Sequence, residues 1–142
     1  MLNNKINLMK TKNLMILSLM ISTLLLFSFA FQDKPWVVPD KYVKMTNPVK
    51  ADDESLKEAK GLWTKHCTSC HGKTGKGDGT KAAQLETEMR DLSSAELQKQ
   101  SDGELFYKTL EGRDEMPTFK KKIAEEDDVW LLVNFIRTLK GK

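Results

Sequence analysis

The amino-acid sequence predicts the all-α fold class, with helices joined by long loops. Apolar residues recur at three- and four-residue spacing in two long stretches, and no stretch alternates apolar and polar residues as a half-buried strand does. Hydrophobic residues make up 39% and aromatic residues 8% of the 142 residues, which is little for a self-sufficient core. A bound cofactor would supply the missing apolar volume, so we expect the helices to wrap around one.

Residues 1–30 have the pattern of an export signal or an N-terminal membrane anchor. Three lysines precede an apolar stretch at residues 14–31, and the small residues Ser28 and Ala30 favour cleavage after Ala30. The stretch is longer than the roughly 7–15 residues of a typical signal core. It also reaches the roughly 17 residues that can span a membrane, so a retained tether is the alternative. In both cases we expect the remaining chain in the periplasm.

The charge distribution argues against nucleic acid as a partner. Lys5, Lys10 and Lys12 account for the whole formal net charge of +3, so basic and acidic residues balance in the rest of the chain. The cluster at residues 120–122 is too small to displace many counterions from nucleic acid. It is interpreted as a solvated loop before a helix, with docking to an acidic partner protein as the alternative.

Residues 31–50 are predicted to form an extended arm ahead of the main domain at residues 51–142. Three of the four prolines lie in this arm, and proline disfavours helix both at its own position and at the preceding residue. We expect Trp36 and Tyr42 to hold the arm against the domain; a loose linker is the alternative.

Two long helices are expected, one near each end of the main domain. The first begins at Asp52 or Asp53, either of which can cap it. The residues of its inner face are Leu56, Ala59, Trp63 and His66. The last helix covers about residues 125–140, with acidic residues at its start and Arg137 and Lys140 near its end, where they suit the helix dipole.

Two shorter helices and a glycine-rich loop are expected between the long ones. Capping-box spacing at Ser93 and Glu96 predicts the start of one short helix, and the same spacing at residues 101–104 predicts the second. Gly112 is expected to end the second helix. Four glycines in residues 72–79 forbid regular structure in the loop after the first long helix.

The chemistry of the chain is concentrated in the sequence Cys-Thr-Ser-Cys-His at residues 67–71. Cys67 and Cys70 are the only two cysteines, and a C-x-x-C-H sequence is the c-type haem attachment pattern. Each thiol can form a thioether with a haem vinyl group, and His71 then faces the iron from the same side. We therefore predict one covalently attached haem c, with His71 as an axial ligand of its iron.

Three other interpretations of this sequence are weaker. A thiol–disulfide redox site favours cysteines at a helix N-terminus, whereas this pair follows a predicted helix. A zinc site would need His66 together with Cys67, Cys70 and His71, and adjacent residues fit a tetrahedron poorly. A structural disulfide would close a very short loop and stabilise little. No catalytic triad is recognisable, and His66 is the only other histidine, so we expect no catalytic residues.

Met116 is the expected sixth ligand of the iron. It lies in the loop between Gly112 and the last helix, and Pro117 restricts it to extended backbone, which suits a side chain presented from a loop. A thioether ligand raises the reduction potential of haem iron. The alternatives are Met45, in the proline-containing arm, and Met89, in a polar stretch.

These motifs together resemble a class I monohaem cytochrome c over residues 51–140. The resemblance implies a compact helical fold around the haem, in which the first and last helices cross with Trp63 against Phe135. Ala59 stands where the family often has glycine, which implies that the two helices approach each other slightly less closely at their crossing. The matching stretches are residues 62–72, 75–79, 101–106, 116–119 and 130–139.

The sequence therefore predicts an electron-transfer protein and not an enzyme. We expect a periplasmic carrier that passes single electrons between respiratory or dehydrogenase partners, either free or tethered to the membrane through residues 14–31. One alternative is a cytochrome subunit of a larger periplasmic redox complex. The other is a haem enzyme or gas sensor with an open iron position, which would require that Met116 does not bind the iron.

Overall fold

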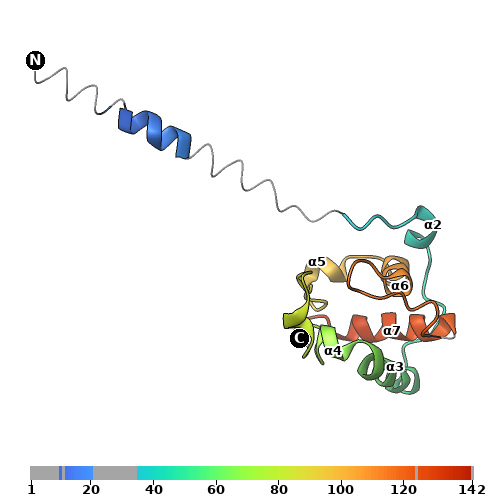
Figure 1. The fold of residues 1–142 in the computed structure, drawn as a ribbon. Coiled ribbons are helices and arrows are strands. Elements are labelled where there is room, and N and C mark those ends of the chain that lie inside the picture. The colour runs from blue at the N-terminus through green and yellow to red at the C-terminus, as the bar shows by residue number, and fades with distance from the viewer. Residues whose placement is uncertain (1–9, 11, 21–34, 124, 142) are drawn as a thin grey trace, which may run out of the picture. The chain divides into compact units, whose positions relative to one another are not determined.

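The computed structural model describes residues 10, 12–20, 35–123 and 125–141 (Figure 1). The chain divides into two compact units, Met1–Trp36 and Val37–Lys142. In the first unit residues 12–20 are helical. Among the described residues, no helix is long and apolar enough to cross a membrane. The predicted cleavage site at Ala30 and much of the apolar stretch lie outside the described residues.

The second unit is helical, and the predicted all-α fold class is confirmed. No strand occurs in the described residues; an isolated bridge joins Arg113 and Met116. Its helices, in chain order, are α2 (Asp40–Val43), α3 (Asp53–His66), α4 (Thr68–His71), the 3-10 helix η1 (Ala82–Gln84), α5 (Ala95–Gln98), α6 (Asp102–Glu111) and α7 (Glu126–Thr138).

The core lies where α3 and α7 pack together (Figure 1). The Trp63 and Phe135 rings lie 5.0 Å apart, which confirms the predicted contact between the first and last long helices. Ala59 is completely buried on α3, so its methyl group is accommodated where the helices approach. On the other side of α7, Trp130 stacks on Phe106 of α6 with ring centroids 4.1 Å apart. The aromatic side chains thus link three helices into one core.

The arm before α3 is folded against the domain, and it is not wholly extended as predicted. Residues Asp40–Val43 form the short helix α2, which packs on α6. The predicted anchor Tyr42 lies 4.7 Å from Tyr107, measured between ring centroids. The backbone of Tyr42 also passes so close to Gly103 that a Cβ at that position would collide with it. Helix α6 needs this glycine because the arm lies directly on its first turn.

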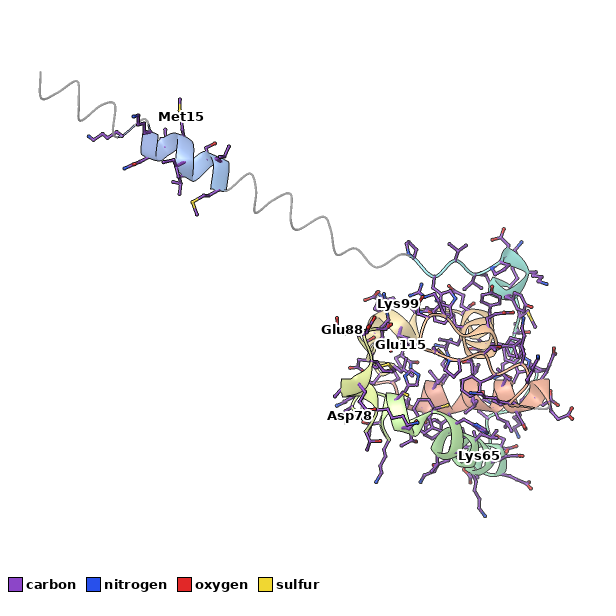
Figure 2. The ribbon with its side chains drawn as sticks, in the orientation of Figure 1. Met15, Lys65, Asp78, Glu88, Lys99 and Glu115 are labelled. Atoms are coloured by element: carbon purple, nitrogen blue, oxygen red, sulfur yellow. The ribbon has the colours of Figure 1, made fainter. Side chains whose placement is uncertain are left out.

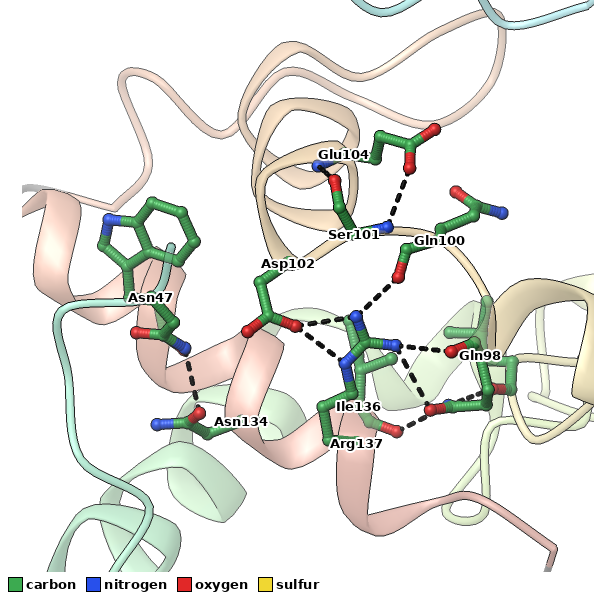
Figure 3. A network of polar contacts seen from close by, with 11 residues as sticks. Asn47, Gln98, Gln100, Ser101, Asp102, Glu104, Asn134, Ile136 and Arg137 are labelled. Carbon is green, nitrogen blue, oxygen red and sulfur yellow. Dashed lines mark hydrogen bonds and ion pairs between the residues drawn. The ribbon is translucent and has the colours of Figure 1, made fainter. Parts of the chain in front are cut away.

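A second contact holds the end of the arm to α7 (Figure 3). The side-chain amide of Asn47 donates to the Asn134 side-chain oxygen at 2.9 Å and to the Trp130 carbonyl at 3.1 Å. Asn134 in turn donates to the Val49 carbonyl at 3.0 Å. Asn134 is buried, so these bonds satisfy a polar group that would otherwise be costly in the core.

The helix starts follow the capping rules, with one difference from the prediction. Asp52 caps α3 in a reciprocal capping box with Ser55, and Ser101 caps α6 together with Glu104, as predicted. Helix α5 is capped by Ser94 and not by Ser93. The Ser93 hydroxyl instead donates to Asp91 at 2.6 Å, and this local turn shifts the helix start by one residue.

Arg137 fastens α7 to the segment between α5 and α6 (Figure 3). Its guanidinium donates to the Asp102 carboxylate at 2.8 Å and to the carbonyls of Gln98 and Gln100 at 3.0 and 2.6 Å. Gln98 itself donates to the Ile136 carbonyl at 2.9 Å. The planar guanidinium fork thus binds the last carbonyl of α5, a carbonyl of the following loop and the carboxylate at the start of α6 at once.

Candidate functional site

The two cysteines and His71 lie on one tight turn at the end of α3. Cys67 is the C-cap of α3 and the N-cap of α4, and its carbonyl accepts from the His71 amide at 2.9 Å. Cys67 is buried, with 9% of its surface exposed, and Cys70 is half-buried. The sequence prediction that both thiols share one turn is therefore met by the backbone.

The glycine-rich loop folds back over this turn and binds its backbone. The amides of Gly77, Gly79 and Lys81 donate to the carbonyls of residues 71, 70 and 69 at 3.0, 3.1 and 2.8 Å. A Cβ at Gly79 would collide with the backbone of Ser69 and Cys70. Gly77 has φ +75°, a conformation that is costly for other residues. Glycine is thus required because the loop backbone lies in contact with the turn.

His71 is half-buried, and its Nδ1 is completely covered. Its ring lies 5.8 Å from the Trp63 ring, measured between centroids, and burial lowers the pKa of His71 to about 4. The buried Nδ1 has no hydrogen-bond partner in the part of the chain that the structure describes. Trp63 is itself fixed, because its Nε1 donates to the Gly72 carbonyl at 3.1 Å. The lowered pKa favours the neutral imidazole, which is the form that binds a metal ion through one of its ring nitrogens.

Cys67 has the properties of a buried structural thiol. Burial, with a smaller effect of Cys70, raises the pKa of Cys67 to about 12, so its thiolate is disfavoured at neutral pH. Both cysteines are free thiols. Thiol–disulfide exchange and zinc binding both require the thiolate. Within the described ranges, no group of three or more His, Cys, Asp and Glu side chains is placed to hold a metal ion. Burial therefore disfavours Cys67 as the attacking thiol of a redox site or as a zinc ligand.

Met116 lies at the end of a two-residue hairpin between α6 and α7. The Arg113 amide donates to the Met116 carbonyl and the Met116 amide to the Arg113 carbonyl, both at 2.9 Å. Gly112, at φ +70°, is close-packed against the backbone of Met116 and Pro117. The Met116 side chain is half-buried and packs against the hydrophobic cluster that contains Trp63 and Cys67.

The two other candidate methionines lie elsewhere. Met45 packs against Gly103, where the arm crosses α6. Met89 covers Gly77, whose amide is bound to the His71 carbonyl. Met89 therefore packs on the loop that holds His71, whereas Met116 is presented from a separate hairpin.

His66 lies at the end of α3, on the face that the sequence predicts to point inward. It is half-buried, and its ring meets the edge of Phe119 at 5.9 Å between centroids. Burial and the charges of Lys65 and Lys122 lower the pKa of His66, while Asp128 opposes them. Phe119 follows Met116 in the same loop, so His66 is a contact between α3 and that loop.

The sequence reasoning missed one polar contact beside Met116. The Glu115 carboxylate accepts from the Thr87 amide at 2.7 Å, a contact between residues 28 positions apart. The amide and the hydroxyl of Thr87 lower the pKa of Glu115. No local pattern in the sequence indicates this pair, because the acceptor lies on a hairpin and the donor in a loop without regular structure.

The helical fold and its C-x-x-C-H turn define a c-type cytochrome. A family model described as cytochrome c oxidase, cbb3-type, subunit III matches residues 54–136, and the chain belongs to this cytochrome c family. The protein is accordingly an electron-transfer cytochrome with covalently bound haem c. The turn that carries both free cysteines and His71, whose lowered pKa favours the neutral imidazole, fits that group.

Two solved structures are similar to this chain. A chain of the Kuenenia stuttgartiensis reducing HAO-like protein complex Kustc0457/Kustc0458 shares the fold, with a TM-score of 0.60 and 21% identity. The match covers 80% of this chain and 54% of that one, so this protein spans about half of its length. The c-type cytochrome KustC0563 is 32% identical with a TM-score of 0.51, over 58% of this chain and 96% of that one. No curated protein matches the chain.

Proposed function

We propose that this cytochrome is a periplasmic one-electron carrier whose haem c is held by Cys67 and Cys70 and ligated by His71 and Met116. The observation that carries the proposal is the position of His71 on the same turn as both thiols, with a pKa lowered to about 4 so that its imidazole is neutral. Met116 supports it, because this side chain packs against the hydrophobic cluster that contains Cys67 and is presented from a separate hairpin.

Each residue has a distinct task in this proposal. When bound, the haem supplies one-electron chemistry between the ferric and ferrous states of its iron. Cys67 and Cys70 fix the group to the chain, and His71 donates a nitrogen without first losing a proton. The Met116 thioether favours the ferrous state and raises the potential. Two permanent protein ligands leave no open position, which favours electron transfer over substrate binding at the iron.

Met116 is preferred over the other methionines on geometric grounds. Met89 packs on Gly77 of the loop that is bound to the His71 carbonyl, so it is engaged in the packing of that loop. Met45 is engaged between the arm and α6. Neither placement suits a sixth ligand.

Replacing the three methionines one at a time tests the ligation. Met116→Ala in the haem-loaded protein should abolish the sulfur–iron charge-transfer absorption. It should also lower the reduction potential by a substantial part of the roughly 0.8 V that axial ligands span. Optical spectroscopy and redox titration measure both effects. Met45→Ala and Met89→Ala are the matched controls and should keep the absorption; its loss in either control, with retention in Met116→Ala, would refute the assignment.

The proposed location rests on the N-terminal pattern of residues 1–30. Three lysines, then the apolar stretch 14–31, then small residues at Ser28 and Ala30 support export. The intact mass of the protein recovered from periplasmic and membrane fractions tests this. A periplasmic species that begins at residue 31 indicates cleavage, and a membrane-bound species with the full N-terminus indicates a tether. Recovery from the cytoplasm would contradict the proposal.

A second candidate is a cytochrome subunit of a larger redox complex. It is favoured by the matched family's description as an oxidase subunit and by the similar chain that belongs to a reducing HAO-like complex. The haem chemistry of this chain would be the same, and the partner would hold the substrate. Size-exclusion chromatography of the native protein from its own cells distinguishes the carrier from the subunit. A free carrier should elute at the size of this chain alone, whereas a subunit should elute at a larger size, together with its partner.

An open-site haem protein is the remaining alternative. It differs in one property, because an iron without Met116 binds carbon monoxide readily when reduced. We expect the reduced wild-type protein at neutral pH to resist carbon monoxide and Met116→Ala to bind it. Rapid binding by the wild type would favour the sensor or enzyme alternative.

A further inference from the structure

The hairpin that carries Met116 is attached to α6 through the residues that follow it, because the Phe119 amide and the Thr118 hydroxyl both donate to the Leu110 carbonyl at 3.0 Å. It is closed by the paired backbone bonds between Arg113 and Met116, and its two central residues, Asp114 and Glu115, are exposed. Asp114 has φ +53°, and no other non-glycine residue in the described part of the chain has a positive φ. A two-residue turn of this kind is compact, but its own bonds do not fix where it lies relative to the rest of the domain.

A hydrogen bond from Thr87 to Glu115 connects the exposed tip of the hairpin to a second part of the domain. The Glu115 carboxylate accepts from the Thr87 amide at 2.7 Å, and the two residues belong to different loops. Figure 2 labels Glu115 beside Glu88, the residue that follows Thr87. Because Glu115 directly precedes Met116, a restraint on its side chain also restrains the backbone from which Met116 projects.

The segment that contains Thr87 is itself bound to the His71 side of the site. Met89 packs on Gly77, and the Leu92 amide donates to the Gly75 carbonyl at 2.7 Å. The Gly77 amide donates to the His71 carbonyl. A continuous series of contacts therefore runs from the His71 backbone through the glycine-rich loop and residues 87–92 to Glu115.

We propose that Glu115 is a positioning residue for Met116: its hydrogen bond with Thr87 holds the hairpin in place and slows release of the Met116 sulfur from the iron. This inference rests on the proposed function, since it takes Met116 as the sixth ligand. Glu115 is exposed, so the bond contributes little to overall stability. The effect of the bond is expected on the loop that carries Met116, because displacement of this loop would remove Met116 from the iron.

Three variants separate the hydrogen bond from the charge. Glu115→Ala removes the acceptor. Glu115→Gln removes the charge but keeps an oxygen that can accept from the Thr87 amide. Asp114→Asn removes a carboxylate from the neighbouring position, together with its 3.2 Å ion pair to Arg113, and leaves the Glu115–Thr87 bond intact. Asparagine also tolerates the positive φ of Asp114.

The experiment is displacement of the ligand by imidazole in the ferric, haem-loaded full chain. At saturating imidazole the rate of loss of the sulfur–iron absorption reports how fast Met116 leaves the iron. We expect Glu115→Ala to raise this rate about three- to tenfold, the range of one hydrogen bond. Glu115→Gln and Asp114→Asn should stay close to wild type, and the thermal unfolding midpoint should be almost unchanged in all three.

Each contrary outcome has a defined meaning. A wild-type rate in Glu115→Ala overturns the positioning role and leaves the ligation by Met116 standing. Equal acceleration in Glu115→Ala and Asp114→Asn assigns the effect to charge and also overturns it. Absence of the sulfur–iron absorption from the wild-type protein refutes Met116 as ligand, and the positioning role with it.

Discussion

The regions that carry His71 and Met116 are held in different ways. The His71 turn continues a long helix, lies against the buried Trp63 ring, and has three successive carbonyls bound by the glycine-rich loop. Met116 lies on a two-residue hairpin whose tip is exposed and is bonded to a distant loop through the Glu115 side chain, while the Met116 side chain itself packs on the core cluster. The first region belongs to the core, whereas the second is attached to it. Substitutions around His71 should therefore affect folding, and those around Met116 should affect the spectrum and the potential.

The largest effect is expected at Trp63. Trp63→Ala removes the contacts with the Phe135 and His71 rings and the hydrogen bond to the Gly72 carbonyl. We expect a loss of about 3–5 kcal/mol in the free energy of unfolding, measured by denaturant titration of the haem-loaded protein. Trp63→Phe keeps a ring at the helix crossing and should cost clearly less. A loss below about 1 kcal/mol in Trp63→Ala would show that the His71 region is not part of the core.

The next comparison is between a glycine in close contact with other backbone and a glycine with open space around it. Gly79→Ala would force a Cβ into the backbone of Ser69 and Cys70, at an expected cost of about 1–3 kcal/mol. Gly61 lies in the middle of α3, and nothing lies within 4 Å of a Cβ placed there. Gly61→Ala should stabilise the protein by about 0.5–1 kcal/mol through helix propensity. Equal effects of the two variants would argue against close contact between the glycine-rich loop and the turn.

The smallest effect is expected at His66, which joins the two regions through Phe119. The pKa of His66 is lowered in the folded protein by burial, Lys65 and Lys122, with Asp128 opposing. The unfolded chain therefore binds the proton more tightly. The wild type should lose stability as the pH falls below about 6.5, the ordinary histidine pKa. His66→Gln should lose less over the same interval, as measured by denaturant titration at pH 8 and pH 5. Equal losses of stability in the wild type and in His66→Gln would show that His66 does not contribute to the pH dependence.

The sequence was most informative where a local rule governs the structure. Capping boxes placed the starts of α3 and α6, Gly112 marked the end of α6, and the all-α class followed from the spacing of apolar residues. The start of α5 was misplaced by one residue because Ser93 and Ser94 are both good caps. Only the turn formed with Asp91 decides between them.

Contacts between distant segments were not predictable in this way. The bonds of Arg137 to loop carbonyls, of Asn47 to Asn134, and of Thr87 to Glu115 join residues with no shared local pattern. The short helix α2 appears in a proline-containing segment because Pro39 occupies its N-cap, where a missing amide proton costs nothing. The sequence predicted His71 as an axial ligand. The burial of its Nδ1 and its lowered pKa could not be predicted, because they depend on the tertiary structure around it.

The pairing of the two ends of the domain also has a consequence for truncation. Asn47 and Asn134 are 87 residues apart, and Trp63 and Cys67 share their core cluster with residues of α7. A chain cut before α7 would therefore expose Cys67 and the aromatic core to solvent. The integrity of the cysteine turn thus depends on a helix that carries none of the proposed haem ligands.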